Sequence, residues 1–583
     1  MPDTSLSPEE PAKKDGRPKR KGRYKPKGRQ VDPQRLAAVR AILGDQLASG
    51  GLVRDRLIEY LHILQDDAGY LAAADLAALA DIMRLPMAEV WEVASFYDHF
   101  DLVREGQTPP PPRTIRVCTS LSCALAGAED MLAGLQAEAG ADVRFVAAPC
   151  LGACDKAPAA ADGHHLIETA NTDSLRRMAA GAPVRDGLTG YTGFEAYRAA
   201  GGYQLAEALA AGRADKDHLL AVLSESALRG LGGAGFPTGR KWSIVRGYDG
   251  PRYLAVNGDE GEPGTFKDRH YLSTDPHRMI EGVLIAAHIV GIDKAFIYMR
   301  DEYPEIIEML RDELAKVRGA GLAGHVEIEL RRGAGAYICG EESAMIESIE
   351  GKRGLPRHRP PYVAEAGIFG QPTLVNNVET LFWVRDILEH GADWYNAQGK
   401  DGHPGFRTYS VSGRVKRPGL VTAAAGSTAE ELIAACGGMA DGHAFKAYLP
   451  GGASGGILPA SKADIPLDFG GALAEEGCFV GSHAVVVLSD KDNIWAAAQN
   501  LMRFFAHESC GQCTPCRSGT QKAAEMMASP APDTDLLGEL AVVMSDASIC
   551  GLGQAAPNPL VSAMTHFPQD IGQDDNAPEQ AGE

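Results

Sequence analysis

The sequence lacks long apolar segments and is short of positive charge. No run approaches the ~18–20 apolar residues of a membrane-spanning helix, and no apolar signal core occurs near the N-terminus. We therefore expect a cytoplasmic protein with no membrane part. Lysine and arginine total 57 against 77 aspartates and glutamates, and the net charge of -20 argues against general nucleic-acid binding. A chain of 583 residues is too long for one core, so several domains are expected.

Cysteine is also scarce, with 11 in the whole chain. In a cytoplasmic protein such cysteines are typical of metal or cofactor ligands and not of a disulfide framework. Eight of them fall into two groups. The other three, Cys339, Cys436 and Cys478, stand alone, and we interpret them as buried packing residues.

The first group pairs a C-x4-C segment, Cys118 and Cys123, with a C-x3-C segment, Cys150 and Cys154. Four thiolates on two neighbouring loops can hold tetrahedral zinc or an iron–sulfur cluster. Zinc ribbons favour C-x2-C, so the wider spacing favours a [2Fe–2S] cluster, whose ligands straddle two irons.

The second group is Cys510, Cys513 and Cys516, spaced C-x2-C-x2-C, with Cys550 as a distant fourth. Three such cysteines can bind three corners of a cubane-type cluster, and a remote cysteine can bind the fourth. Zinc sites rarely use three cysteines this tightly. The spacing therefore predicts a [4Fe–4S] cluster.

The chain is organised around the glycine-rich stretch 229–268, which contains neither the dinucleotide G-x-G-x-x-G pattern nor the P-loop GKS/T pattern. Dense glycines let backbone N–H groups approach an anion, and Lys241 adds a charge suited to a phosphate. A short apolar strand at 253–256 and an acidic turn at 257–262 follow. The acidic turn favours a cofactor site over a flexible loop, because its carboxylates can accept hydrogen bonds from ribitol, ribose or ring N–H groups.

Composition and periodicity predict α/β and α+β domains in series. Helices are expected at 131–138, 278–290, through Leu310 and Leu314, and at 428–436, and the apolar helix face of the N-terminal bundle is expected to continue through 90–100. Strands are expected at 114–117, 143–147, 253–256, 295–298, 326–330, 409–415 and 484–488. The predicted divisions are a disordered basic arm at 1–30, a helical bundle at 31–110, a small α/β domain at 111–182, a linker at 183–203, a Rossmann-like domain with a largely parallel sheet at 204–400, a β-grasp-like module at 401–490, a helical cysteine domain at 491–570 and a disordered tail at 571–583.

The motifs RGLGGAGFPTGRKW and NGDEGEPGTFKD resemble the flavin site of the NADH-oxidising flavoprotein subunit of respiratory complex I. Residues 31 to about 182 are similar to its thioredoxin-like [2Fe–2S] partner subunit, and the second cysteine group matches the [4Fe–4S] site of the flavoprotein. The resemblance implies FMN contacts at Gly232, Gly233, Gly235, Gly239, Lys241, Asn257, Asp259, Glu260, Tyr337, Glu341, Asn376, Asn377 and Thr380. It implies NADH contacts at Phe236, Glu262, Glu342 and Tyr362.

This resemblance implies hydride exchange between NAD(H) and FMN, in which positioning is the catalysis and no protein acid, base or nucleophile is needed. We interpret the 16 histidines mostly as surface or packing residues. A carboxylate near the ribose favours NAD over NADP. Two residues depart from related sites: Arg359 stands where lysine is expected, and Ile244 where an aromatic is common.

The whole chain is most similar to the fused β subunit of bacterial NAD-dependent formate dehydrogenases. That resemblance implies a large α-subunit partner that carries a molybdenum or tungsten bis-pterin cofactor and further iron–sulfur clusters. A partner of the [NiFe]-hydrogenase or complex I kind, a free-standing diaphorase and a zinc-stabilised scaffold without flavin remain alternatives.

Overall fold

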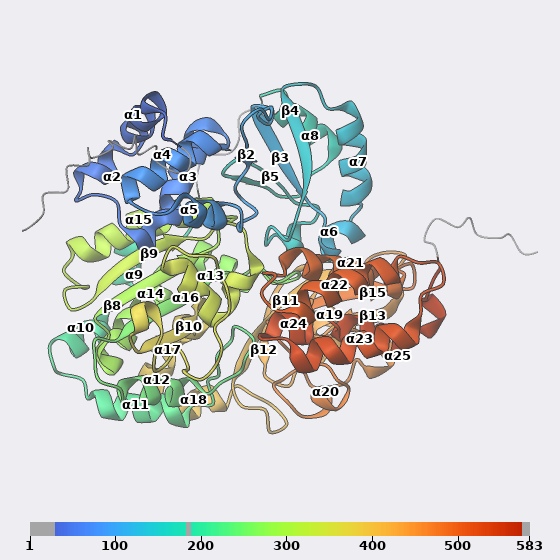
Figure 1. Cartoon of the computed structure of the whole chain (residues 1–583). Helices are drawn as coiled ribbons and strands as arrows, with labels where there is room; N and C mark the ends of the chain where they lie inside the picture. The colour runs from blue at the N-terminus through green and yellow to red at the C-terminus, as the bar shows by residue number, and fades with distance from the viewer. Residues whose placement is uncertain (1–29, 182–187, 574–583) are drawn as a thin grey trace, which may run out of the picture.

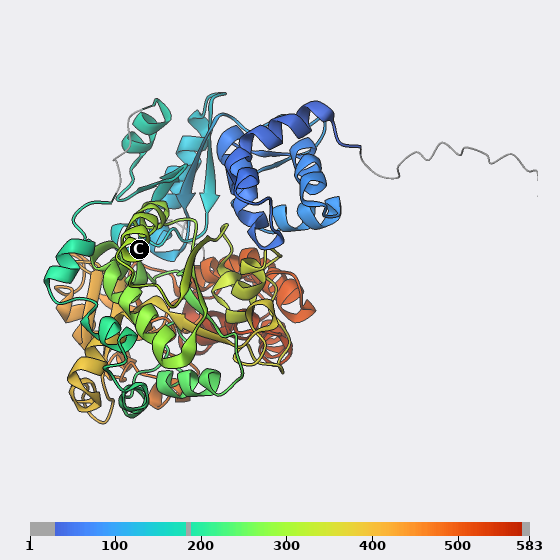
Figure 2. The ribbon, with the colours of Figure 1, turned by 90° about the vertical axis from the view of Figure 1, so that its left-hand side faces the viewer.

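The computed structural model describes residues 30–181 and 188–573 (Figure 1). The basic arm at 1–29, the first part of the linker and the tail from 574 onward lie outside these residues. The domains pack around one another, with the helical bundle and the small α/β domain side by side on the domain predicted to bind flavin, here called the flavin domain (Figures 1 and 2). Among the described residues, no helix combines the length and hydropathy that crossing a membrane requires.

The N-terminal bundle comes first in the chain. Its elements are α1 (Pro33–Ile42), α2 (Gly44–Ala48), η1 (Arg54–Arg56), α3 (Leu57–Ala68), β1 (Leu71–Ala72), α4 (Ala73–Met83), α5 (Met87–Ala94) and β2 (Leu102–Val103). The expectation that one apolar helix runs through 90–100 is wrong in its second half. Helix α5 ends at Ala94, and turns follow. Tyr97 and Phe100 lie in this non-helical segment, and their side chains are buried. The apolar spacing therefore reflects burial and not a helix.

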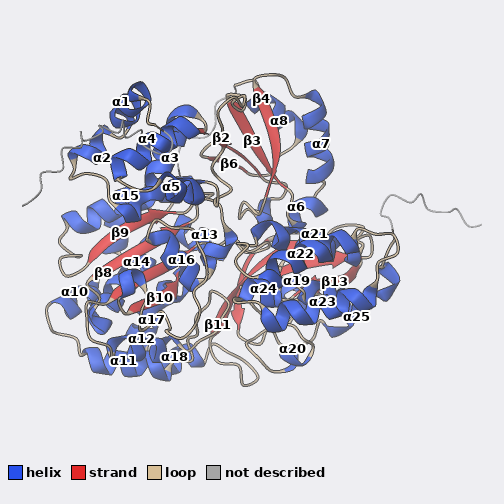
Figure 3. Cartoon of the chain, viewed as in Figure 1, coloured by secondary structure: helices blue, strands red, loops and turns tan. Residues whose placement is uncertain are grey.

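The small α/β domain has a four-stranded sheet in the order β4-β3-β5-β6 (Figure 3). Strands β3 and β4 are parallel, whereas β5 is antiparallel to β3. The elements are β3 (Arg113–Cys118), α6 (Leu121–Leu125), α7 (Ala128–Glu138), β4 (Val143–Ala148), η2 (Cys154–Lys156), β5 (Ala160–Asp162), β6 (His165–Ile167) and α8 (Thr172–Ala179). The strands predicted at 114–117 and 143–147 and the helix at 131–138 are confirmed.

The flavin domain is built on a fully parallel sheet in the order β10-β7-β8-β9. Strand β8 is buried along nearly its whole length, as expected for a parallel sheet covered on both faces. The elements are α9 (Phe194–Ala199), α10 (Gln204–Ala210), α11 (Lys216–Glu225), α12 (Thr238–Arg246), β7 (Tyr253–Gly258), α13 (Lys267–Thr274), α14 (Pro276–Ala286), the π-helical turn η3 (Ala287–Gly291), β8 (Lys294–Met299), α15 (Pro304–Gly319), β9 (Glu327–Arg332), η4 (Tyr337–Gly340), α16 (Glu342–Ile349), η5 (Ile368–Gly370), β10 (Thr373–Asn377), α17 (Val378–His390) and α18 (Ala392–Asn396).

The order of these strands creates a topological switch point. The chain moves outward from β7 to β8 and β9, and it then returns to place β10 on the other side of β7. Ligands of open parallel sheets bind outside the carboxyl ends of the strands at such a point. At this point Asn377, the last residue of β10, is the register partner of Asn257, the next-to-last residue of β7.

A mixed five-stranded sheet in the order β12-β11-β15-β13-β14 forms the next module. Its elements are β11 (Phe406–Gly413), β12 (Gly419–Ala424), α19 (Ala429–Ala435), β13 (Phe445–Leu449), β14 (Leu458–Pro459), η6 (Ala460–Lys462), α20 (Ala472–Glu475) and β15 (Ala484–Ser489). The C-terminal helices are α21 (Ile494–Glu508), α22 (Thr514–Met527), α23 (Thr534–Ala547), α24 (Gly551–Ala555) and α25 (Asn558–His566), followed by η7 (Pro568–Asp570). The predicted α/β and α+β multidomain fold is confirmed.

Candidate functional site

A cavity of about 530 Å³ lies at the carboxyl edge of the parallel sheet. Three parts of the chain line it: the flavin domain, the mixed-sheet module and the C-terminal helices. The residues of the predicted site that line it are Gly232, Gly233, Asn257, Asp259, Glu260, Glu262, Tyr337, Glu341 and Asn377. These residues form one wall of the cavity, although their motifs are up to 145 positions apart in the chain, from Gly232 to Asn377.

The other residues of the predicted site lie behind this wall or at the surface. Thr380 accepts a hydrogen bond at Oγ1 from the backbone N–H of Leu231, 3.0 Å away, and Asn376 accepts one from Trp242 Nε1 at 2.9 Å. Phe236 and Tyr362 are 37% and 59% exposed, so their rings are accessible for stacking. The residues outside the cavity lining are Gly235, Phe236, Gly239, Lys241, Glu342, Tyr362, Asn376 and Thr380.

The glycines of the motif have two different tasks. A Cβ on Gly235 would lie 2.5 Å from the Phe469 ring, and one on Gly239 would lie 2.6 Å from the Ser224 backbone, so both serve packing. Gly233 faces the cavity and has a φ of +121°, which side chains rarely adopt. It allows the backbone to approach a bound group closely.

Lys241 is held beside the site by two oxygen atoms. Its Nζ donates to the carbonyl of Val375 at 3.2 Å and lies 4.0 Å from Glu342 Oε2. Burial lowers the pKa of Lys241, and Glu342 acts in the opposite direction. Arg359 pairs with Glu342 at 2.9 Å and with Glu341 at 2.6 Å, so the predicted departure at Arg359 lies beside both predicted cofactor carboxylates.

Several predicted cofactor carboxylates also hold the loops around the cavity. The two oxygens of Glu260 accept the N–H groups of Asp268 and Arg269 at 2.8 and 3.0 Å, which caps the start of α13. Glu262 Oε1 accepts the N–H of Ser454 at 2.9 Å, which joins the flavin domain to the mixed-sheet module. These carboxylates therefore shape the cavity through the backbone as well as through any contact with a bound group.

Asp259 gives the cavity an unpaired hydrogen-bonding group. Its Oδ2 is buried and has no hydrogen-bond partner among the described residues. Burial raises the pKa of Asp259 well above its usual range, which favours the neutral acid, and this form can donate as well as accept. An unpaired buried oxygen costs about 1–3 kcal/mol, and a hydrogen bond with a bound group removes this cost.

Many lining residues of the cavity were not predicted. Thr265, Lys267 and Asp268 belong to the acidic motif itself, whereas Ser454, Phe479, Gly481, Ser482, Gly551, Leu552, Gln554, Ala555 and Asn558 come from the mixed-sheet module and the C-terminal helices. The Gly-rich segment 451–456 was an available signal, but nothing in the sequence indicated that it lies opposite the flavin motif.

Burial of carboxylates beside the cavity predicts a pH-dependent stability. Burial, with the nearby charge of Asp268, raises the pKa of Glu260 to about 7. A carboxyl group that binds its proton more tightly in the folded state stabilises the protein at low pH, and this contribution is lost as the pH rises through about 7. The free energy of unfolding should therefore fall between pH 5 and pH 8. Since one pKa unit corresponds to about 1.36 kcal/mol, the contribution is up to about 3 kcal/mol.

Denaturant unfolding at several pH values measures this slope. Glu260→Gln should flatten it, whereas the exposed control Glu525→Gln should leave it unchanged. An equal slope in wild type and Glu260→Gln would exclude Glu260 as its source.

The first cysteine group converges at one end of the small α/β domain. All four thiols are buried and free of disulfides, and the Sγ atoms of Cys150 and Cys154 are 3.5 Å apart. Gly152 donates its N–H to Cys150 Sγ at 3.4 Å. Hydrogen bonds from Cys118 and Cys154 lower the pKa of Cys150. Four buried sulfurs with a backbone donor suit an iron–sulfur cluster.

This cysteine group borders the flavin domain directly. Cys150 and Cys154 pack against Phe266, the neighbour of the cavity residue Thr265. The buried guanidinium of Arg300 donates to the carbonyl of Cys150 and to that of Glu260, each at 2.5 Å. One layer of residues thus separates the first cysteine group from the cavity.

The second cysteine group surrounds a small cavity between α22, α24 and the loops before them, lined by Cys510, Cys513, Cys516 and Cys550. Ile338 and Leu552 line this cavity and also the 530 Å³ cavity. The two spaces therefore share a wall. The remaining cysteines, Cys339, Cys436 and Cys478, are also buried and free of disulfides, which agrees with their interpretation as packing residues.

Four segments match known protein families. Residues 46–181 match the thioredoxin-like [2Fe–2S] ferredoxin family, 223–386 the Nuo51 FMN-binding domain, 408–458 the SLBB domain and 496–574 the NADH-ubiquinone oxidoreductase-F iron–sulfur binding region. The SLBB match falls on the module predicted to be β-grasp-like.

Whole proteins match as well. The chain is 41% identical over 388 residues to the F 2 subunit of NADH-quinone oxidoreductase from Rhizobium meliloti, an alignment that covers 64% of this chain and 91% of the relative. It is 40% identical over 389 residues to the F subunit of the same enzyme from Streptomyces coelicolor, with coverage of 64% and 86%. Among solved structures, a chain of an NAD⁺-reducing [NiFe]-hydrogenase in the H₂-reduced state superposes with a TM-score of 0.78 at 34% identity, covering 89% of this chain and 92% of that one.

The cavity and the two cysteine groups fit one class of protein, the NADH-dependent electron-transfer subunits that carry FMN, a [2Fe–2S] and a [4Fe–4S] cluster. Within that class, the chain belongs to the family of the NADH-quinone oxidoreductase F subunits. The thioredoxin-like segment 46–181 precedes the part of the chain that matches the flavoprotein.

Proposed function

We propose that this chain is the diaphorase subunit of an NAD-dependent formate dehydrogenase. The partner would be a large α subunit that carries a molybdenum or tungsten bis-pterin cofactor and further iron–sulfur clusters. The observation that carries the proposal is the presence, in one chain, of a complete first cysteine group that packs directly on the flavin domain at Phe266. The sequence resemblance to fused β subunits of formate dehydrogenases supports the choice of partner.

The residues around the cavity define how the chain would act. Gly232 and Gly233 give the backbone access to FMN, and the paired Asn257 and Asn377 place two amides at the switch point. Glu262 and Glu342 would orient the nicotinamide nucleotide, with the accessible rings of Phe236 and Tyr362 available for stacking. When bound, FMN exchanges a hydride with NAD(H) and single electrons with iron–sulfur clusters.

Electron transfer requires the flavin cavity and the two cysteine groups to lie close together. The shared wall of Ile338 and Leu552 brings the second cysteine group next to the cavity, and the contact of Phe266 with the first group does the same on another side. No side chain is required as general acid, base or nucleophile, since the protein's contribution is positioning and exclusion of water.

An NAD-reducing [NiFe]-hydrogenase is the second candidate for the whole complex. The similar solved hydrogenase chain covers 89% of this chain, which includes more than the flavoprotein part alone. A complex I core would equally accept electrons from such a subunit. In each case the role of this chain is the same and the partner differs.

Isolation of the complex from its native cells tests the proposal. Co-purification of a large subunit containing molybdenum or tungsten, with formate-dependent reduction of NAD⁺, is the expected result. A nickel-containing partner with hydrogen-dependent reduction would contradict the formate assignment and leave the diaphorase role intact. A chain that purifies alone and reduces only artificial acceptors would contradict both kinds of partner.

A further inference from the structure

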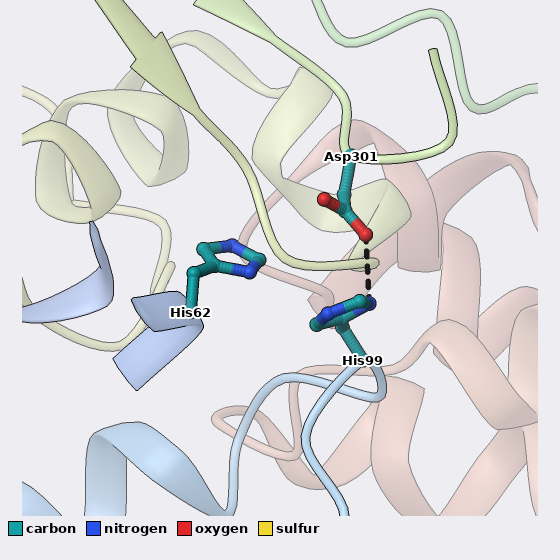
Figure 4. Close-up of side chains that lie close together, drawn as sticks. All are labelled: His62, His99 and Asp301. Atoms are coloured by element: carbon teal, nitrogen blue, oxygen red, sulfur yellow. Dashed lines mark ion pairs between the residues drawn. The ribbon is translucent and has the colours of Figure 1, made fainter. Parts of the chain in front are cut away.

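Three side chains meet where the helical bundle rests on the flavin domain (Figure 4). His62 comes from α3, His99 from the turns after α5, and Asp301 from the second position after the end of β8. One ligand atom from each lies within 4.8 Å of one from the others. His62 is 2% and Asp301 7% exposed, and the side chain of His99 is 14% exposed. None of the three residues lines the 530 Å³ cavity, and Asp301 follows Arg300, which donates to the carbonyl of Cys150.

One nitrogen of each imidazole is held by a defined partner. His62 Nε2 is 2.7 Å from the carbonyl oxygen of Gly333, and His99 Nδ1 is 2.7 Å from Asp301 Oδ2 (Figure 4). A carbonyl can only accept, so His62 Nε2 carries a hydrogen and Nδ1 of the neutral ring carries a lone pair.

The other nitrogen of each imidazole is buried and has no hydrogen-bond partner among the described residues. These atoms are His62 Nδ1 and His99 Nε2. The two ring centres are 4.8 Å apart and tilted by 49°, so the rings are not stacked face to face. Two buried ring nitrogens without a partner in one place are costly for a structural packing role.

This arrangement is the one that metal-binding histidines use. Such histidines donate their second ring N–H to a carbonyl or a carboxylate, which fixes the tautomer and the orientation of the ring. Gly333 and Asp301 are in these positions. Asp301 is itself held by Arg332, whose Nε donates to Oδ1 at 2.5 Å. The positive charge of Arg332 is opposed by Asp301 and by Asp66, 3.1 Å from its Nη1.

A cavity of about 50 Å³ adjoins His99 and Asp301. It is also lined by Asp98, Glu302 and His165, whose Nδ1 is a further buried atom without a partner in the described part of the chain. A water needs roughly 10–15 Å³ of such volume and two to four polar partners. His62 does not line this cavity and Arg116 does, so the cavity offers room for water on the His99 side of the histidine pair.

We propose that His62 Nδ1 and His99 Nε2, together with water, bind one divalent transition-metal ion of the zinc class, while Asp301 orients His99 from its other ring nitrogen. Neutral imidazole together with water oxygen suits such borderline cations better than magnesium or calcium. Zn–N bonds of about 2.0–2.1 Å would place the two ring nitrogens about 3.3 Å apart in a tetrahedral site. The ion joins the helical bundle to the flavin domain and takes no part in electron transfer.

Metal analysis of the full chain with its flavin and clusters tests this site. The untagged protein is incubated with Zn²⁺, freed of loosely bound ions by gel filtration, and analysed for zinc and iron together. We expect one retained zinc per chain in wild type and loss of this zinc in His62→Gln and His99→Gln, with iron and flavin absorbance unchanged. His288→Gln is the matched control, since His288 also has a buried unpaired Nε2 but lies outside the cluster, and it should retain the zinc.

X-ray absorption at the zinc edge provides the second readout and does not depend on the folding of a variant. The expected spectrum has only nitrogen and oxygen neighbours near 2.0–2.1 Å, whereas zinc bound by cysteine would show sulfur near 2.3 Å. Failure of wild type to retain zinc, sulfur neighbours, or equal zinc in a folded His62→Gln protein would each overturn the proposal.

Discussion

Replacing Cys516 with alanine is expected to reduce electron transfer from NADH to the partner subunit to background. Cys516 is 4% exposed at the first turn of α22 and lines the small cavity together with Cys510, Cys513 and Cys550. A [4Fe–4S] cluster needs all four thiolates, so loss of one ligand removes or degrades it. The large cavity keeps its own lining, because Cys516 does not reach it.

The experiment compares two activities in the same preparation. Bleaching of the flavin by NADH should persist in Cys516→Ala, while partner-linked turnover disappears and the iron content falls. Cys436→Ala is the matched control, because Cys436 is equally buried at 4% exposure but lies in the mixed-sheet module. Partner-linked turnover at the wild-type rate in Cys516→Ala would show that electrons leave by another route.

The second large effect is expected at Lys267, the buried cation below the cavity. Its Nζ lies 3.0 Å from Asp268 Oδ1 and 3.0 Å from Glu379 Oε2, and the three side chains are at most 4% exposed. Asp268 in turn accepts from Asn377 Nδ2 at 2.6 Å, so the ion cluster positions one of the paired amides. The neighbouring carboxylates raise the pKa of Lys267 although its burial acts in the opposite direction, so the ammonium group stays charged.

Lys267→Met should lower the free energy of unfolding of the flavin domain by roughly 3–5 kcal/mol, because it leaves two buried carboxylates without their cation. Flavin occupancy should fall with it, since Lys267, Asp268 and Asn377 all line the cavity. Denaturant unfolding and the flavin-to-protein absorbance ratio measure the two effects.

A double variant separates charge from packing. Adding Glu379→Gln to Lys267→Met should recover part of the lost stability, since it removes one uncompensated charge. The exposed control Lys522→Met should change the stability by less than about 0.5 kcal/mol. Wild-type stability in Lys267→Met would contradict the role given to this cation.

The strands of the flavin domain could be predicted because their apolar runs are short and uniform. The segments 253–256 and 295–298 lie inside β7 and β8, and each is almost fully buried. The apolar run at 90–100 misled the prediction, since Tyr97 and Phe100 are buried from turns. Apolar periodicity indicates which side chains are buried, and side chains in turns can be buried at the same spacing as those on a helix.

Site residues could be predicted where one motif supplies neighbouring atoms, and not where separate domains meet. Asn257 and Asn377 follow from two motifs, yet only the parallel pairing of β7 with β10 brings them side by side. Ser454 and Leu552 face them from domains whose sequence gives no hint of that contact. The histidines were interpreted as mostly surface or packing residues, because the expected reaction needs no protein acid or base. His62, His99 and Asp301 share no sequence motif and converge only through domain packing.

Anaerobic addition of NADH to the purified chain without any partner tests the proposed electron path directly. The flavin absorbance should bleach, and electron paramagnetic resonance should then detect reduced iron–sulfur clusters of two kinds. This result is expected because the second cysteine group shares a wall with the cavity and the first group packs on Phe266, next to the cavity residue Thr265. Protein that contains flavin and iron but stays oxidised in excess NADH would contradict the account.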